Sequence, residues 1–130
     1  MFQQIITKIS KGTHKIEYLY RNTLIGYVSF FNPPKNSIDT SLTKIYIYPK
    51  YRHNNLGSTI LKLTESYLNN TFGITNLSVV AWIPSNVHNN VSQFYNQNGY
   101  TPSLIYPSSI YDDGDIMYDI VPLVKNISQN

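Results

Sequence analysis

The sequence predicts an α+β domain with a mixed, mostly antiparallel sheet, and three observations support this fold class. Four β-rich runs separated by short turns occupy residues 3–48. The spacing of apolar residues changes to that of a helix from residue 58, and a strand, a second helix and two further strands follow. The central strand–helix–strand order indicates a parallel crossover within the otherwise antiparallel sheet. A chain of 130 residues is expected to form one domain spanning 1–130.

The N-terminal third predicts three strands joined by tight turns. Gln3 to Ile9 alternates loosely between polar and apolar residues, and Lys11-Gly12-Thr13 follows it as a turn. His14 to Tyr20 and Leu24 to Phe31 are rich in β-branched and aromatic residues. The short Arg21-Asn22-Thr23 segment between these two runs predicts a hairpin.

The next segment predicts the strand and the helix of the crossover. A loop rich in Pro and Asn at residues 32–36 precedes the strand Leu42 to Tyr48, which ends at Pro49. The helix is expected from Ser58 to Asn70, with Gly73 closing it. Its apolar stripe is formed by Leu56, Ile60, Leu63 and Tyr67, with Leu61 and Leu68 beside them.

The C-terminal part predicts one strand, one helix and two final strands. Leu77 to Trp82 is a nearly continuous apolar run, which predicts a strand buried on both faces. Residues 84–86 offer a helix start, and Gly99 offers a C-terminal cap. The last strands are expected at residues 100–106 and 116–123, and the polar tail from Lys125 is expected to fray.

Composition and charge exclude several classes of protein. The net charge is +3, but the Lys and Arg residues are scattered, which argues against a nucleic-acid-binding protein. The chain has no Cys, which excludes disulfides and thiolate metal sites, and its His residues lack the spacing of metal ligands, so no metal is expected. No signal peptide or membrane-spanning run is visible, so we expect a cytoplasmic protein.

The segment Arg52-His53-Asn54-Asn55-Leu56-Gly57-Ser58 lies between the predicted strand and helix of the crossover. Unpaired backbone N–H groups and the helix dipole at such a position bind phosphate oxygens. Gly57 permits close approach of the backbone, and Arg52 places a positive charge beside the anion. The segment therefore predicts a binding loop for a diphosphate.

Three further segments accompany this loop. Ile47-Tyr48-Pro49-Lys50-Tyr51 leads into it, Tyr95-Asn96-Gln97-Asn98-Gly99-Tyr100 ends the second helix, and Asp115-Ile116-Met117-Tyr118 opens the last strand. Together they resemble the GCN5-related N-acetyltransferase (GNAT) superfamily, whose diphosphate loop reads Gln/Arg-x-x-Gly-x-Gly/Ala and whose later helix ends in Tyr-x-x-x-Gly-Phe. The resemblance covers roughly Leu24 to Leu123 and implies a GNAT-like fold.

The sequence departs from the family pattern at two places. Asn55 stands where the first loop Gly is usual, and Asn tolerates positive φ better than other residues with a side chain. The family usually inserts two helices after its first strand, whereas only Lys11-Gly12-Thr13 lies there in this chain. The resemblance therefore implies a minimal version of the fold, with an acceptor side that is open or closed by a partner subunit.

The resemblance implies that the protein is an acetyl-CoA-dependent N-acetyltransferase that acts on a primary amine, such as a small amine, a polyamine, a lysine or a protein N-terminus. It implies that the pantetheine arm pairs with Ile47 and Tyr48 on one side and with Val80, Ala81 and Trp82 on the other. His88 is a further candidate cofactor contact, beside its interpretation as an exposed residue at a helix start. The implied diphosphate contacts are Arg52, His53, Asn54, Asn55, Leu56, Gly57 and Ser58.

Tyr95 matches the family's general acid, which protonates the leaving thiolate. A phenol with a pKa near 10 gives its proton to a thiolate with a pKa near 8.5 at a modest cost. The structural alternative is that Tyr95 anchors its helix in the core. Because the adjacent Phe94 already fills that role, we favour the catalytic interpretation.

The general base is narrowed by elimination among seven carboxylates. Glu65 is expected on the solvated face of the first helix. Glu17 is the candidate that we retain, with the loop Asp112-Asp113-Gly114-Asp115 as an alternative that also reads as a hairpin turn. A water relay without a dedicated carboxylate remains open beside both.

Two other classes of function compete with the transferase. One is a catalytically weak or inactive GNAT-fold protein that binds CoA and acts through a partner, which Asn55 and the missing helices favour. The other is a nucleic-acid-binding domain that uses tyrosine stacking. An exposed sheet edge and many tyrosines are compatible with a homodimer, but the sequence does not decide the oligomeric state.

Overall fold

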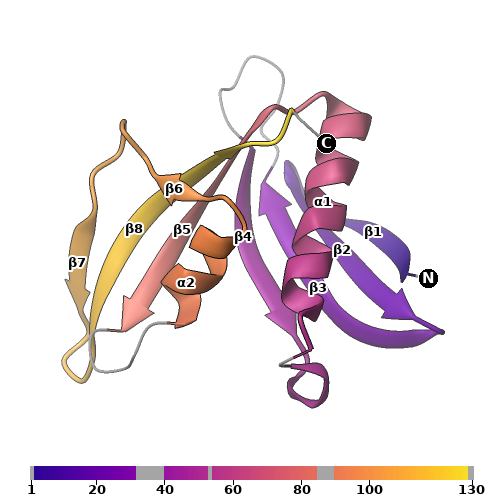
Figure 1. Ribbon diagram of the computed structural model, residues 1–130, viewed down its shortest axis with the longest axis horizontal. Coiled ribbons are helices and arrows are strands. Elements are labelled where there is room, and N and C mark those ends of the chain that lie inside the picture. Colours follow the sequence, from indigo (N-terminus) through magenta and orange to yellow (C-terminus); the bar gives the residue numbers. More distant parts are fainter. Residues whose placement is uncertain (1, 32–39, 53, 85–89, 129–130) are drawn as a thin grey trace. The chain divides into compact units, whose positions relative to one another are not determined.

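Figure 1 shows the computed structural model, which describes residues 2–31, 40–52, 54–84 and 90–128. The chain divides into two compact units. The N-terminal unit comprises Met1–Leu77 and Asn126–Asn130, and the C-terminal unit comprises Ser78–Lys125. The candidate diphosphate loop therefore lies wholly in the N-terminal unit, and Tyr95 lies in the C-terminal unit.

The N-terminal unit begins with an antiparallel meander. Its strands are β1 (Phe2–Ser10), β2 (Thr13–Tyr20), β3 (Thr23–Phe31) and β4 (Thr40–Ile47), and they pair in this order. The four strands predicted from the sequence are confirmed, with ends shifted by at most two residues. Both predicted turns are also confirmed.

The turn between β2 and β3 shows why its residues suit a hairpin. Arg21 and Asn22 both have positive φ, at 51° and 65°. A two-residue hairpin loop whose twist matches the strands needs this conformation at both positions. Asn adopts it at lower cost than most residues, so Asn22 explains part of the turn and Arg21 is held there by the pairing of the strands.

A short 3-10 turn, η1 (Pro49–Tyr51), follows β4, and helix α1 (Leu56–Phe72) follows the loop. The helix begins two residues before the predicted start at Ser58. It ends at Gly73, which has a φ of 68° and donates its N–H to the carbonyl of Asn69 at 2.9 Å. The predicted role of Gly73 is therefore confirmed.

Helix α1 packs on one face of this sheet, against β3 and β4 (Figure 1). A directed chain of hydrogen bonds joins the two layers. Gln4 Nε2 donates to the Tyr18 hydroxyl at 3.1 Å, Tyr18 is 2.6 Å from Thr64 Oγ1, and Thr64 Oγ1 donates to the Ile60 carbonyl at 2.8 Å. Because the single Thr64 proton goes to Ile60, the Tyr18 hydroxyl is the donor to Thr64. The core side chains of this layer include Ile16, Val28, Phe30, Leu42, Ile60, Leu61 and Leu68.

The stripe that α1 buries includes the predicted Ile60, Leu61 and Leu68, whereas Leu56, Leu63 and Tyr67 are only half-buried. Ile60, Leu61, Thr64, Glu65 and Leu68 are buried, and Glu65 is only 2% exposed. The expectation that Glu65 lies on a solvated face is therefore wrong. The apolar spacing located the helix, but it did not reveal that the polar residues Thr64 and Glu65 are buried as well.

The C-terminal unit contains most of β5 (Asn76–Pro84), then α2 (Asn90–Gln97), β6 (Thr101–Pro102), β7 (Ser109–Asp112) and β8 (Met117–Asn126). The strand order is β5-β8-β6, and β7 pairs with β8 as an antiparallel hairpin. The helix predicted to start at residues 84–86 begins at Asn90, and residues 85–89 lie outside the described part of the chain. Gly99, with a φ of 90°, follows the helix as predicted.

Three expectations for this end of the chain are wrong. The strand expected at residues 100–106 is only Thr101–Pro102, because the Ser103 hydroxyl accepts the N–H groups of Ile105 and Tyr106 at 3.1 Å and forms a turn. Strand β5 alternates in burial instead of being buried on both faces, since Val80 and Trp82 are each 49% exposed. The tail is ordered through Ile127, whose N–H donates to the Thr75 carbonyl at 2.7 Å.

Candidate active site

Asn55 sets the backbone conformation at the start of α1. Asn55 caps the helix in the left-handed conformation, with φ 59° and ψ 16°. Its carbonyl accepts the N–H of Thr59 at 3.2 Å and the Thr59 hydroxyl at 3.1 Å. The expectation that Asn55 supplies the positive φ usually given by Gly is confirmed.

The first turn of α1 is formed by residues of the predicted loop, because the helix starts at Leu56. The N–H groups of Leu56 and Gly57 precede the first full turn, so no carbonyl of the helix itself lies in position to accept them. The first turn carries no acidic residue that would compete for an anion. This end of the helix therefore presents a positive dipole end to a phosphate group.

Gly57 lies within the helix and is not among the glycines with positive φ. Gly57 therefore suits this position because it lacks a side chain, and not because it adopts an unusual backbone conformation.

Arg52 connects the loop to the end of β4. Its Nε donates to the carbonyl of Ile47 at 2.7 Å, and its guanidinium carbon lies 5.1 Å from the centre of the Tyr46 ring. The terminal nitrogens of the guanidinium retain donors that this bond does not use. Arg52 thus holds the strand end and keeps a positive charge next to the loop.

The backbone of Ile47 is directed away from β3. Tyr48 donates its N–H to the Ile25 carbonyl at 3.0 Å, so Tyr48 bonds toward β3. Successive residues of a strand direct their N–H and C=O groups to opposite sides, so those of Ile47 point to the other edge of β4. The Ile47 carbonyl is held there by Arg52, and the Ile47 N–H points to the same edge.

Glu17 lies on the face of the sheet opposite α1. The strand register places Glu17 beside Tyr27, and Tyr27 beside Tyr46 on β4. With strands about 4.8 Å apart, Glu17 is two strands, or roughly 10 Å, from β4. A carboxylate at that distance can contact an amine beside Ile47 only through a water molecule. It can contact an amine directly only if that amine lies over Tyr27.

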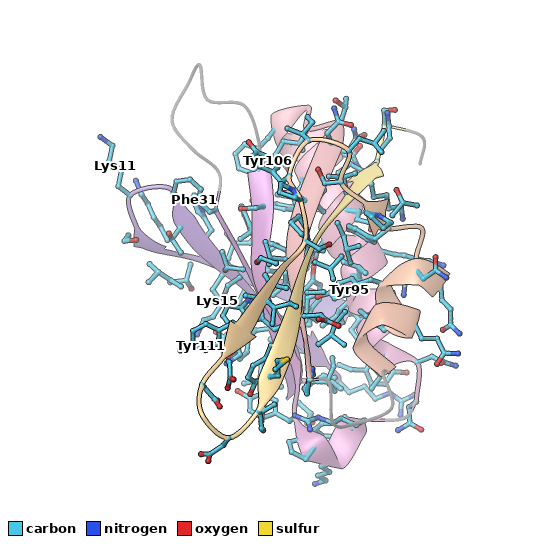
Figure 2. All side chains as sticks on the ribbon, turned by 90° about the vertical axis from the view of Figure 1, so that its left-hand side faces the viewer. Lys11, Lys15, Phe31, Tyr95, Tyr106 and Tyr111 are labelled. Carbon is cyan, nitrogen blue, oxygen red and sulfur yellow. The ribbon has the colours of Figure 1, made fainter. Side chains whose placement is uncertain are left out.

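Tyr95, labelled in Figure 2, is the buried anchor of α2. It is 9% exposed, its ring centre lies 5.2 Å from that of Phe94 and 5.7 Å from that of Tyr100, and burial raises the pKa of its phenol. The neighbouring Phe94 is less buried, so the argument that Phe94 already fills the anchoring role is wrong. Tyr95 packs in the core, and its catalytic role stays a prediction.

The acidic loop is a hairpin turn between β7 and β8. Asp112 accepts the N–H of Gly114 at 2.9 Å, and Asp113 accepts the N–H groups of Asp115 at 2.9 Å and Ile116 at 2.7 Å. The backbone donors of Ile116 and Asp115 hold the pKa of Asp113 below its usual range. A carboxylate whose charged form is stabilised in this way is a poor base, which favours the turn interpretation.

The sequence matches the model of the Acetyltransferase (GNAT) family over residues 3–100. The chain belongs to the GNAT acetyltransferase family. No curated protein matches the sequence significantly.

Solved GNAT structures share the fold. A GNAT family acetyltransferase from Elizabethkingia anophelis with acetyl-CoA bound has 15% identity and a TM-score of 0.71, over 96% of this chain and 97% of that one. The ribosomal-protein-S18-alanine N-acetyltransferase of Escherichia coli has 16% identity and a TM-score of 0.71, over 93% and 73%. The spermidine/spermine N-acetyltransferase SpeG of Vibrio cholerae has 11% identity and a TM-score of 0.75, over 92% and 68%. The predicted GNAT-like α+β fold with a strand–helix–strand crossover is confirmed.

The remaining predicted cofactor contacts lie on β5, in the loop before α1, or outside the described residues. Val80 and Trp82 lie on β5, and the Trp82 ring packs edge-on against Tyr111 and Tyr118, with ring centres 5.6 and 5.7 Å apart. Asn54 is exposed in the loop. His53 and His88 lie outside the described residues, so their predicted contacts stay predictions.

The described residues of the GNAT chain form neither a metal-binding cluster nor a membrane-spanning helix. Within the described ranges, no three His, Asp or Glu side chains gather as a metal site requires. None of the helices in the described part of the chain is long and apolar enough to cross a membrane. Sequence reasoning did not select Lys15, Tyr27, Lys44 and Tyr46, which strand pairing brings together with Glu17 on one sheet face.

Proposed function

We propose that the protein transfers the acetyl group of acetyl-CoA directly to a primary amine. The observation that carries this proposal is the connection between an anion-binding helix end and the edge of β4 through the Arg52–Ile47 hydrogen bond of 2.7 Å. One compact unit would thereby supply both the diphosphate site and the backbone edge for the pantetheine arm. The similar Elizabethkingia anophelis structure has acetyl-CoA bound, which supports the cofactor.

Binding would use the backbone more than side chains. The first-turn N–H groups of Leu56 and Gly57 would hold the diphosphate, with the charge of Arg52 beside it. The pantetheine amides would pair with the edge of β4 at Ile47 and Tyr48. This arrangement fixes the cofactor before an acceptor arrives, so the thioester is held in place for attack.

The chemical step is addition of the amine nitrogen to the thioester carbonyl carbon. Negative charge then develops on the carbonyl oxygen, and the Ile47 N–H is the proposed donor that stabilises it. Collapse of the intermediate breaks the carbon–sulfur bond and releases the thiolate. Before the attack, the substrate ammonium would lose a proton to Glu17 through water and so become the nucleophilic amine, and after the collapse Tyr95 would protonate the thiolate.

Burial of Tyr95 sets the conditions for its role. Because burial raises its pKa above the usual value near 10, the phenol stays protonated at neutral pH. Transfer of the phenol proton to a thiolate whose thiol has a pKa near 8.5 costs at least about 2 kcal/mol in the free protein. The step is feasible if binding of the cofactor brings the developing thiolate charge next to the phenol.

A second candidate is a CoA-binding protein with little or no turnover. The specific observations that favour it are the separation of Glu17 from β4 by the intervening strand β3 and the lowered pKa of Asp113. Neither carboxylate is placed as an efficient base.

Release of free thiol from acetyl-CoA in the presence of a panel of primary amines separates the two functions. Amine-dependent release, with the acetylated amine identified by mass spectrometry, supports the transferase. Binding of acetyl-CoA without release by any amine at pH 7 to 9 supports the binding protein.

A further inference from the structure

Cationic side chains gather on the face of the N-terminal sheet opposite α1. Side chains alternate along β2, and because Ile16 and Tyr18 are buried under α1, Lys15 lies on the other face. The strand register places Lys15, Ser29 and Lys44 in one row across β2, β3 and β4. Two lysines therefore flank a small hydroxyl side chain on this face.

Two aromatic rings hold these cations in place. The Nζ atoms of Lys15 and Lys44 lie 5.4 and 5.8 Å from the centre of the Tyr27 ring. Lys44 Nζ also lies 5.4 Å from the centre of the Tyr46 ring, and the guanidinium carbon of Arg52 lies 5.1 Å from that centre. The two ring centres are 5.6 Å apart. The rings thus keep three positive charges near one another despite their mutual repulsion, and we call this group of side chains the cationic face.

The cationic face retains charge and hydrogen-bond donors for a ligand. Within the described part of the chain, no carboxylate pairs with the three cations, and no hydrogen bond uses the ammonium N–H groups of Lys15 or Lys44. Glu17, beside Tyr27 in the register, is the one described carboxylate of this sheet face, and its single charge leaves the face positive. Lys44 and Arg52 are exposed. The face therefore attracts an anionic ligand.

The two lysines are too far apart for a single carboxylate to contact both. Lys15 on β2 and Lys44 on β4 approach the Tyr27 ring on β3 from its two sides. Two strand spacings correspond to about 10 Å. Alternate residues of an extended polypeptide lie about 7 Å apart on one side of its backbone, so two acidic side chains at such positions reach one lysine each.

The occupied rings favour a polypeptide over a single-stranded nucleic acid. Such a nucleic acid binds by stacking its bases on aromatic faces as well as through its phosphates. The faces of Tyr27 and Tyr46 already carry cations, so the stacking contribution is lost. Pairing between carboxylates and the lysines does not need a free ring face.

We propose that the cationic face docks an extended acidic segment of a polypeptide, and that this polypeptide carries the amine that is acetylated. The second part of the proposal rests on the proposed transferase function. Lys15 and Lys44 each hold one acidic side chain. Arg52 adds positive charge beside them and remains part of the loop that binds the cofactor.

Binding of peptides without a free amine tests the docking independently of turnover. One probe carries Glu at alternate positions, as Glu-Thr-Glu-Thr-Glu, and the other carries Gln in place of each Glu. Both have an acetylated N-terminus and a fluorescein label at the C-terminus. Fluorescence anisotropy should give a Kd about tenfold lower for the Glu peptide at low salt, and the ratio should shrink as salt is added. Equal Kd values overturn the inference.

Oligothymidylate with the same label is the comparison for a nucleic acid. We expect it to bind more weakly than the Glu peptide, because base stacking on the rings is blocked. Tighter binding of oligothymidylate, lost when both lysines are changed to Gln, would show that the face binds nucleic acid and would overturn the inference.

Charge variants assign the binding to this face. Lys15→Gln and Lys44→Gln should each weaken binding of the Glu peptide, and the double Gln variant should bind both peptides equally. The double variant Lys15→Arg with Lys44→Arg keeps the charges and should keep most of the preference. Lys62→Gln changes an exposed lysine on α1 and is the matched control that should retain it. A preference that survives in the double Gln variant overturns the assignment.

Acceptor peptides with a free N-terminus test the second part of the proposal. We expect kcat/KM for Ser-Glu-Thr-Glu-Thr-Glu to exceed that for Ser-Gln-Thr-Gln-Thr-Gln by about tenfold in the parent protein, and the two values to be equal in the double Gln variant. Equal values in the parent, despite preferential binding of the blocked Glu peptide, overturn this second part.

Failure of the docking and failure of the transferase function give different results. If the blocked Glu peptide binds preferentially but no amine is acetylated, the proposed function fails and the docking stands. If simple amines are acetylated but neither binding nor rate distinguishes the peptides, the inference fails and the transferase function stands.

Discussion

Arg52 donates through Nε to the carbonyl oxygen of Ile47 at 2.7 Å, and this bond joins the helix-end loop to the last residue of β4. The peptide between Ile47 and Tyr48 is thereby held at both of its polar groups, since the Tyr48 N–H donates to Ile25. The edge proposed to bind pantetheine is fixed by the same residue that places a positive charge beside the proposed diphosphate site.

The contribution of this bond is tested by two changes at Arg52. Arg52→Gln removes the charge and the Nε donor, and we expect acetyl-CoA to bind about tenfold more weakly. Arg52→Lys keeps the charge but lacks the planar donor, so an intermediate loss is expected. Calorimetry measures both affinities, and an unchanged affinity for Arg52→Gln would remove Arg52 from the site.

Gly57 tests the first turn of α1. Gly57→Val places a branched side chain where the proposed diphosphate meets the backbone, and we expect acetyl-CoA binding to be lost. Asn70→Val, an exposed position in the same helix, is the matched control for adding a branched apolar side chain to the surface of α1. Circular dichroism should show both variants folded. Persistent binding by Gly57→Val would show that the loop assignment is wrong.

Tyr95→Phe tests the general acid with little change in packing. The ring remains in contact with Phe94 and Tyr100, so thermal stability should stay close to that of the parent. We expect kcat to fall by about tenfold or more, with the affinity for acetyl-CoA unchanged. Steady-state kinetics and calorimetry measure the two quantities. A variant with unchanged kcat would reduce Tyr95 to a core residue.

Tyr18 predicts how stability depends on high pH. Burial is the main cause that raises its pKa, while the hydrogen bonds with Thr64 and Gln4 act in the opposite direction. Its stabilisation is therefore complete below pH 10, the ordinary tyrosine value, and is lost as the pH rises through the raised folded-state pKa. We expect the free energy of unfolding to fall with pH across this alkaline window.

Tyr18→Phe isolates this effect. The variant loses the hydroxyl that bonds Thr64 at 2.6 Å, so it should be less stable by about 1 kcal/mol at pH 7. Its stability should fall less steeply above pH 10, because the titrating group is gone. Urea unfolding between pH 7 and 11 measures both differences, and parallel pH profiles for the two proteins would contradict the assignment.

The sequence predicted the elements that depend on local chemistry. The positive φ of Asn22 in the hairpin, the helix end at Gly73 and the positive φ of Asn55 follow from the turn preferences of these residues. The proposed diphosphate loop was also identifiable from the sequence, because it depends on local backbone chemistry. Its donors are backbone groups whose position depends on where one helix begins.

What the sequence missed depends on contacts between segments far apart in the chain. Burial of Glu65 follows from how α1 sits on the sheet, which the spacing of apolar residues does not specify. The juxtaposition of Lys15 and Lys44 follows from the pairing of β2, β3 and β4. That register includes a shift between Tyr18 and Leu19 and another between Ser29 and Phe30, and periodicity alone does not fix such shifts.

The central claim is that the end of α1 and the edge of β4 bind acetyl-CoA through its diphosphate. Calorimetric titration with acetyl-CoA, compared with S-acetylpantetheine, which has the same arm but no diphosphate, tests this claim most directly. We predict a Kd of roughly micromolar for acetyl-CoA and binding at least about a hundredfold weaker for S-acetylpantetheine. Equal affinities, or no binding of acetyl-CoA by the folded protein, would contradict it.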